Sequence, residues 1–125
     1  GYNNRSVAVR VPAGAPEARR LEHRMAGADA NPYLTLAAIL AGIHHGIEHQ
    51  LEPPVARQDN AGAELDPKVP FVWQRALDRV ARAEFLPDYM GLAYLELYRE
   101  CKQFELDAFY KEFTPLEFRW YLAPE

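Results

Sequence analysis

The sequence of 125 residues is short of cysteine and of long apolar runs. Its one cysteine, Cys101, cannot form a disulfide within the chain, which fits a reducing compartment and a cytoplasmic protein. The longest apolar run extends from Tyr33 to Ile43 and is interrupted by Thr35 and Gly42, so it is well short of the ~20 residues that a membrane span needs. We therefore expect neither a disulfide-stabilised secreted domain nor a membrane protein.

Lysine is absent from residues 1–24, where all the cations are arginines: Arg5, Arg10, Arg19, Arg20 and Arg24. With two glutamates this segment has a net charge of +3, whereas residues 25–125 have a net charge of −7. Arginine is suited to bidentate recognition of phosphate and carboxylate. The acidic remainder argues against nucleic acid or an anionic membrane as the main partner, so we expect small anions to bind near the N-terminus.

The first 25 residues alternate apolar and polar side chains in two stretches, 6–11 and 20–25, on either side of the turn-forming segment PAGAP at 12–16. Such alternation predicts two short antiparallel strands. A helix over Glu17–Met25 is the alternative, because no strong breaker lies inside it. Arg20, Glu22 and Arg24 share one face of the second strand.

The remaining residues predict helices. Asn31 is a good N-cap and Pro32 fits the first helical position of a helix from about Pro32 to Leu51, apolar enough in its first half to be buried. Residues 52–69 predict an exposed loop. Further helices are expected over about Pro70–Arg82 and Pro87–Phe113, the second with an apolar packing seam at Met90, Tyr94, Leu97, Cys101, Phe104 and Ala108.

A capping box at residues 114–117 predicts a short last helix. The length predicts a single domain over residues 1–125. Its fold class is α+β and helix-dominated, with strands and site residues in 1–25 and helices in 26–125.

The charged face of the second strand is the strongest candidate site. Side chains two residues apart on a strand lie roughly 7 Å apart on one side. Arginines beside a carboxylate can neutralise phosphate while the carboxylate ligates Mg²⁺ or Mn²⁺. The alternative is a solvated ladder of salt bridges, which contributes little to stability.

Two other groups of side chains are weaker candidates. His45 and His49 have the i, i+4 spacing of helical zinc ligands, with His44 beside them, but a polar-face cluster is the simpler interpretation. Cys101 lies in the apolar seam, and we interpret it as a small core residue. The aromatic residues near the C-terminus indicate packing or a subunit contact.

Four motif blocks then resemble the C-terminal part of the glutamine synthetase family, in the family's order and spacing. They are Asn4-Arg5-Ser6, Val9-Arg10-Val11-Pro12, Ala18-Arg19-Arg20-Leu21-Glu22-His23-Arg24 and Ala30-Asn31-Pro32-Tyr33. The resemblance continues more weakly through residues 114–117 and 120–122. It implies the helix-dominated part of that family's catalytic domain, whose strands complete an active-site barrel and whose subunits assemble into rings.

The resemblance also implies an ATP-dependent ligase that forms γ-glutamyl phosphate and transfers the glutamyl group to an amine. By position, Arg5 would stabilise the transferring phosphoryl group, and Arg10 and Arg20 would contact the nucleotide phosphates. Glu22 would ligate Mg²⁺ or Mn²⁺, and Arg24 would bind glutamate.

Residues 24–31 look more like the γ-glutamylpolyamine or γ-glutamylputrescine synthetase branch than the ammonia-using branch. Residues 34–88 contain no tyrosine, so we expect no regulation by adenylylation. Glu17 stands where the family has a basic residue, which puts a nucleotide-base contact there in doubt.

Family members are much longer, so we expect this chain to be a C-terminal fragment that is inactive alone and oligomeric or poorly soluble. A non-catalytic assembly or regulatory module that keeps the fold is the alternative.

Overall fold

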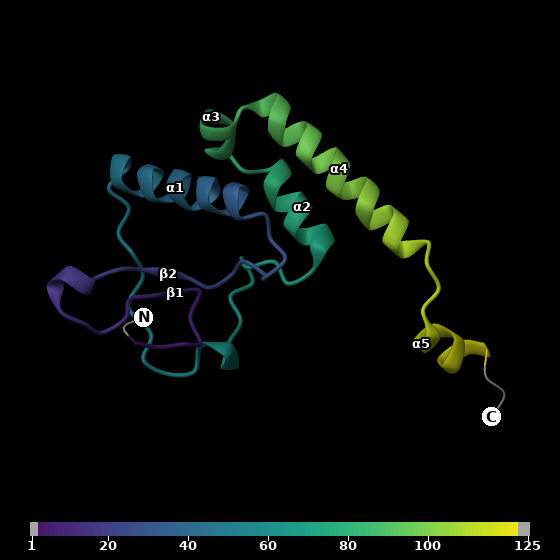
Figure 1. The fold of residues 1–125 in the computed structure, drawn as a ribbon, viewed down its shortest axis with the longest axis horizontal. Helices are drawn as coiled ribbons and strands as arrows, with labels where there is room; N and C mark the ends of the chain where they lie inside the picture. Colours follow the sequence, from purple (N-terminus) through teal and green to yellow (C-terminus); the bar gives the residue numbers. More distant parts are fainter. Residues whose placement is uncertain (1–2, 123–125) are drawn as a thin grey trace. The chain divides into compact units, whose positions relative to one another are not determined.

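The computed structural model describes residues 3–122, so residues 1–2 and 123–125 of the expected domain lie outside the described part (Figure 1). The chain divides into two compact units, Gly1–Val69 and Pro70–Glu125. The first unit holds a strand pair, one long helix and a loop, and the second unit holds helices. This composition agrees with the expected helix-dominated α+β class.

The first unit begins with two short antiparallel strands, β1 (Val9–Arg10) and β2 (Glu22–His23). Val9 pairs with His23 and Arg10 pairs with Glu22. The strands are joined through a 3-10 turn at Pro16–Ala18. The predicted strand pair is therefore confirmed and the helical alternative over 17–25 is wrong, although each strand is shorter than expected. Pro12 and Pro16 have no backbone N–H, which limits how far a ladder can extend.

Helix α1 (Pro32–Glu48) starts where the sequence predicts. The Asn31 side chain accepts hydrogen bonds from the N–H groups of Tyr33 (3.0 Å) and Leu34 (3.2 Å). The helix ends three residues earlier than expected because Gln50 adopts a positive φ of 49°.

The N–H of Gln50 donates to the Ile47 carbonyl, and the N–H of Leu51 donates to the Gly46 carbonyl. These two bonds close a Schellman motif, which satisfies carbonyls that the helix end leaves free. The helix is not buried as expected, because Ala41 is its one buried side chain within residues 3–122.

The second unit is built on the packing of α2 (Trp73–Ala81) and of α3 (Leu86–Met90) against α4 (Leu92–Tyr110). Among the described residues of this unit, the buried apolar side chains are Leu77, Leu95 and Leu106. The amides of Gln74 and Gln103 exchange hydrogen bonds of 3.2 and 3.3 Å between α2 and α4.

The single helix predicted over 87–113 is wrong, because α3 and α4 are separate helices. Gly91 lies between them with φ of 82°, a conformation that glycine adopts without a steric penalty. After α4, Thr114 forms the predicted capping box with Glu117 and opens α5 (Pro115–Glu117), which continues into a π-helical turn at Phe118–Leu122.

The predicted seam on α4 is also not the packed face. Leu97 is 64% exposed and Phe104 is 75% exposed, and Cys101 is exposed rather than in the core. The buried leucines Leu95 and Leu106 lie on a different face, beside the half-buried Lys102 and Gln103. Within residues 3–122, no helix is long and apolar enough to cross a membrane.

Candidate functional site

Three arginines surround the carboxylate of Glu22 in the first unit. Arg10 Nη1 lies 2.9 Å from Glu22 Oε2, Arg20 Nη2 lies 3.4 Å from Oε1, and Arg24 Nη1 lies 3.5 Å from Oε2. Arg10 faces Glu22 across the strand pair, since the two residues are register partners. Arg20 and Arg24 flank Glu22 along the chain, two residues to either side. The structure thus brings together four of the five residues selected from the sequence.

The three contacts differ in tightness. The Arg10 side chain is 13% exposed, and its second Nη atom donates to Asn3 Oδ1 at 2.6 Å. Its Nε atom is buried and has no hydrogen-bond partner among residues 3–122. Arg20 and Arg24 are 59% and 38% exposed at the side chain and hold Glu22 at longer distances. Arg10 is therefore fixed by the protein, while Arg20 and Arg24 can exchange Glu22 for an incoming anion.

The arginines keep Glu22 ionised. The hydrogen bond from Arg10 lowers the pKa of the Glu22 carboxyl below its ordinary value, partial desolvation opposes this, and the charges of the three arginines add to the lowering. The cluster has three positive charges and one negative charge, so on its own it attracts anions. A divalent cation fits only together with anionic ligands such as phosphates, with Glu22 as one oxygen ligand.

Arg5 lies outside this network. It is exposed on the turn at residues 4–7, and its guanidinium has no ion pair among the described residues. The residues on either side of it are anchored instead. Asn4 and Ser6 form hydrogen bonds with the loop at residues 57–61, more than 50 positions along the chain. Sequence reasoning missed this contact, because nothing local in the sequence indicates such a distant partner.

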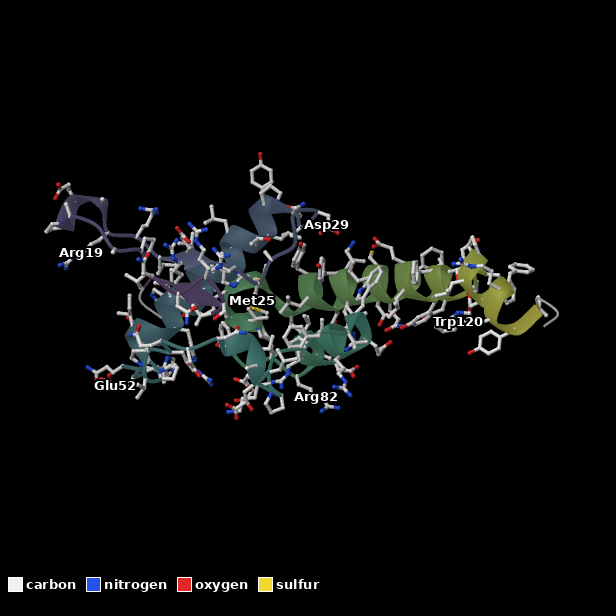
Figure 2. All side chains as sticks on the ribbon, turned by 90° about the horizontal axis from the view of Figure 1, so that it is seen from below. Arg19, Met25, Asp29, Glu52, Arg82 and Trp120 are labelled. Carbon is white, nitrogen blue, oxygen red and sulfur yellow. The ribbon has the colours of Figure 1, made fainter. Side chains whose placement is uncertain are left out.

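Arg19, the remaining early arginine, is not part of the cluster. It is exposed at the outer end of the connection between β1 and β2 (Figure 2). Its adjacent position and its lack of an ion pair among residues 3–122 make it a useful control for the clustered arginines.

The other candidates are not supported as sites. Across residues 3–122, no group of three or more His, Cys, Asp or Glu side chains is placed to hold a metal ion. The rings of His45 and His49 lie 4.1 Å apart, and His49 Nδ1 lies 2.9 Å from the His45 carbonyl oxygen. This arrangement agrees with a polar-face cluster.

Residues 1–121 match the family described as the glutamine synthetase catalytic domain, which confirms the resemblance in the four motif blocks. The chain is 38% identical over 122 residues to the gamma-glutamylputrescine synthetase of Escherichia coli (strain K12). The aligned residues cover 98% of this chain and 26% of that protein. It is 34% identical over 119 residues to a gamma-glutamylethanolamide synthetase of Streptomyces coelicolor, covering 95% of this chain and 26% of that protein.

A glutamine synthetase of Pyrococcus horikoshii is 36% identical over 103 residues, covering 75% of this chain and 23% of that protein. The chain thus spans about a quarter of the length of these relatives.

Proposed function

Because the chain belongs to the glutamine synthetase catalytic-domain family, we propose that the whole protein is an ATP-dependent ligase that joins an amine to the side-chain carboxylate of glutamate. The observation that carries this proposal is the convergence of Arg10, Arg20 and Arg24 on Glu22. Phosphoryl transfer needs charge neutralisation and positioning more than covalent chemistry from the protein, and this cluster can supply both.

In the proposed reaction, a γ-carboxylate oxygen of glutamate attacks the γ-phosphorus of ATP, and ADP leaves. The neutral amine then attacks the carbonyl carbon of γ-glutamyl phosphate, inorganic phosphate leaves as the C–N bond forms, and the amine nitrogen gives up one proton to solvent. The negative charge on the phosphoryl oxygens is the main charge that the site has to stabilise. Guanidinium groups suit this task because they stay protonated throughout.

Each arginine takes a role that agrees with its environment. Arg20 and Arg24 release Glu22 readily, so Arg20 would bind nucleotide phosphate and Arg24 would bind the glutamate substrate. Arg10 would act on the nucleotide phosphates through its positive charge while still holding Glu22. Glu22 would supply one oxygen ligand to Mg²⁺ or Mn²⁺, whose charge helps to neutralise the phosphates. Arg5, exposed on its turn, would stabilise the transferring phosphoryl group.

We propose an organic amine such as putrescine or another polyamine as the second substrate. Two relatives are named as a gamma-glutamylputrescine synthetase and a gamma-glutamylethanolamide synthetase, so both names describe glutamate joined to an organic amine. Their similarity to this chain extends along nearly its whole length. The test is ADP release by the complete protein with glutamate, ATP and, in separate reactions, ammonia, putrescine, spermidine and ethanolamine. Turnover with ammonia alone would contradict the organic amine.

The role of Arg24 has a sharper test. Arg24→Ala in the complete protein should raise the KM for glutamate about 10- to 100-fold, because the substrate carboxylate loses its partner. ATP binding should stay intact, because Glu22 loses its longest ion pair but keeps Arg10 and Arg20. Arg19→Ala is the matched control, since Arg19 is an exposed arginine outside the cluster. Unchanged glutamate kinetics in Arg24→Ala would reject the assignment.

A non-catalytic assembly module is the second candidate, favoured by the exposed apolar faces of α1 and α4. It predicts no ADP release by the complete protein with any amine. Under the ligase proposal, the 125-residue chain alone is inactive, and the complete protein is a cytoplasmic homo-oligomer. Product formation by the isolated chain would contradict the first of these expectations.

A further inference from the structure

The turn that presents Arg5 is held by a distant loop. Asn4 Nδ2 donates to the carbonyl oxygens of Arg57 (3.1 Å) and Asp59 (2.8 Å). Ser6 Oγ accepts a hydrogen bond from the N–H of Ala61 at 2.9 Å. Asn4 and Ser6 are also joined to each other, because Asn4 Oδ1 accepts from both the N–H (2.9 Å) and the hydroxyl (2.7 Å) of Ser6. These contacts lie within the first unit, and we call them the turn clamp.

The loop that receives the turn is itself fixed by charge. The Arg57 guanidinium binds Asp59 in a bidentate pair, with Nε–Oδ1 of 2.8 Å and Nη2–Oδ2 of 2.6 Å. Its remaining Nη1 lies 3.3 Å from a Glu64 carboxylate oxygen. Bidentate pairing restricts the guanidinium geometrically, so the backbone carbonyls of residues 57 and 59 are presented in one arrangement. The turn clamp therefore rests on an ordered surface.

We propose that Asn4 and Ser6 are positioning residues that fix the backbone from which Arg5 reaches the phosphoryl group. This inference rests on the proposed role of Arg5 in the ligase. Both neighbours of Arg5 bind the loop at residues 57–61 through the turn clamp. Arg5 itself is exposed and has no ion pair among residues 3–122. A long, flexible side chain acts on a transferring group only if its backbone is fixed, since small displacements of a positioned group reduce the rate strongly.

The experiment compares variants of the complete protein by ADP release at saturating substrates. Asn4→Asp is nearly isosteric but turns an oxygen toward the two carbonyls, and Ser6→Ala removes the acceptor for the Ala61 N–H. Ser6→Thr keeps the hydroxyl and serves as the conservative rescue. Asp66→Ala is the matched control, because it removes one hydrogen bond of the same kind, from the Lys68 N–H at 2.8 Å, outside the turn clamp.

We expect Asn4→Asp and Ser6→Ala to lower kcat about 10- to 100-fold while KM for ATP changes less than about threefold, with Ser6→Thr and Asp66→Ala close to wild type. In an Arg5→Ala background, Asn4→Asp should reduce kcat by no more than about twofold, because the clamp then has nothing left to position. A purely structural role would instead lower kcat by the same factor in both backgrounds.

The outcomes separate the two proposals. If wild type releases no ADP with any amine, the ligase proposal fails and the positioning role fails with it. If wild type turns over and Arg5→Ala is slow, but Asn4→Asp and Ser6→Ala match Asp66→Ala, only the positioning role is overturned. Equal losses from Asn4→Asp with and without Arg5 overturn it as well.

Discussion

Leu106 is the most buried side chain among the described residues of the second unit, so Leu106→Ala is an informative stability variant. Leu106 is 1% exposed on the face of α4 that packs against α2, where Leu77 is also buried. Truncation to alanine leaves a cavity that the two helices can close only in part.

The expected loss follows from the burial. Removing three buried carbons costs about 2.4 kcal/mol, at ~0.8 kcal/mol for each methylene group. The residual cavity adds to this, and the higher helix propensity of alanine returns a few tenths of a kcal/mol. We therefore expect the free energy of unfolding to fall by about 3 kcal/mol.

Leu97→Ala is the matched control on the same helix. Leu97 is 64% exposed, so its truncation should cost about 0.5 kcal/mol or less. The assay is urea unfolding of the chain, followed by circular dichroism at two protein concentrations so that self-association is detected. A loss for Leu97→Ala equal to that for Leu106→Ala would show that the face predicted from the apolar seam is the packed one, and would refute the reasoning.

Three further predictions concern other parts of the chain. Gly91→Ala should destabilise the second unit by about 1–3 kcal/mol, because alanine is strained at φ of 82°, and unchanged urea unfolding would contradict this. The carboxyl of Glu22 should titrate below its ordinary pKa of 4.5 by NMR. Because the folded pKa of Glu22 is lowered, its contribution to stability is complete above about pH 4.5 and is lost as the pH falls through the folded pKa. The difference in the free energy of unfolding between wild type and Glu22→Gln should therefore close at acidic pH. A Glu22 titration curve with its inflection at or above pH 4.5 would contradict this. The isolated chain should self-associate in sedimentation because large apolar side chains such as Ile47 (69% exposed) and Phe104 (75% exposed) lie at its surface, and a monomer at high concentration would count against this.

Local signals predicted the starts of α1 and α5 well. Asn31 and Pro32 marked the first turn of α1, and Thr114 marked the start of α5, because caps and N1 prolines act within a few residues. The end of α1 was harder to predict, since it depends on Gln50 entering a left-handed conformation that glycine or asparagine usually adopts. The break between α3 and α4 has a signal in the sequence, because Gly91 stands inside the helical pattern. The regular spacing of apolar residues on both sides of Gly91 nevertheless favoured one continuous helix.

The faces and long-range contacts were predicted less completely. Alternation placed Arg20, Glu22 and Arg24 on one face, but it could not supply the register that brings Arg10 opposite Glu22. On α4 the packed face includes the half-buried polar residues Lys102 and Gln103, so this face looked polar in the sequence. The contact of Asn4 with the loop at 57–61 has no local signature at all.

The turn clamp also has a consequence for the order of synthesis. Asn4 leaves the ribosome 55 positions before its acceptor at Asp59. At about 5–20 residues per second, the turn that carries Arg5 therefore waits roughly 3–11 s for its anchor, while the residues of β1, β2 and α1 are already synthesised. The Arg5 turn is thus among the last parts of the first unit to be fixed, and a chain interrupted between Ser6 and Arg57 would keep the motif but not its shape.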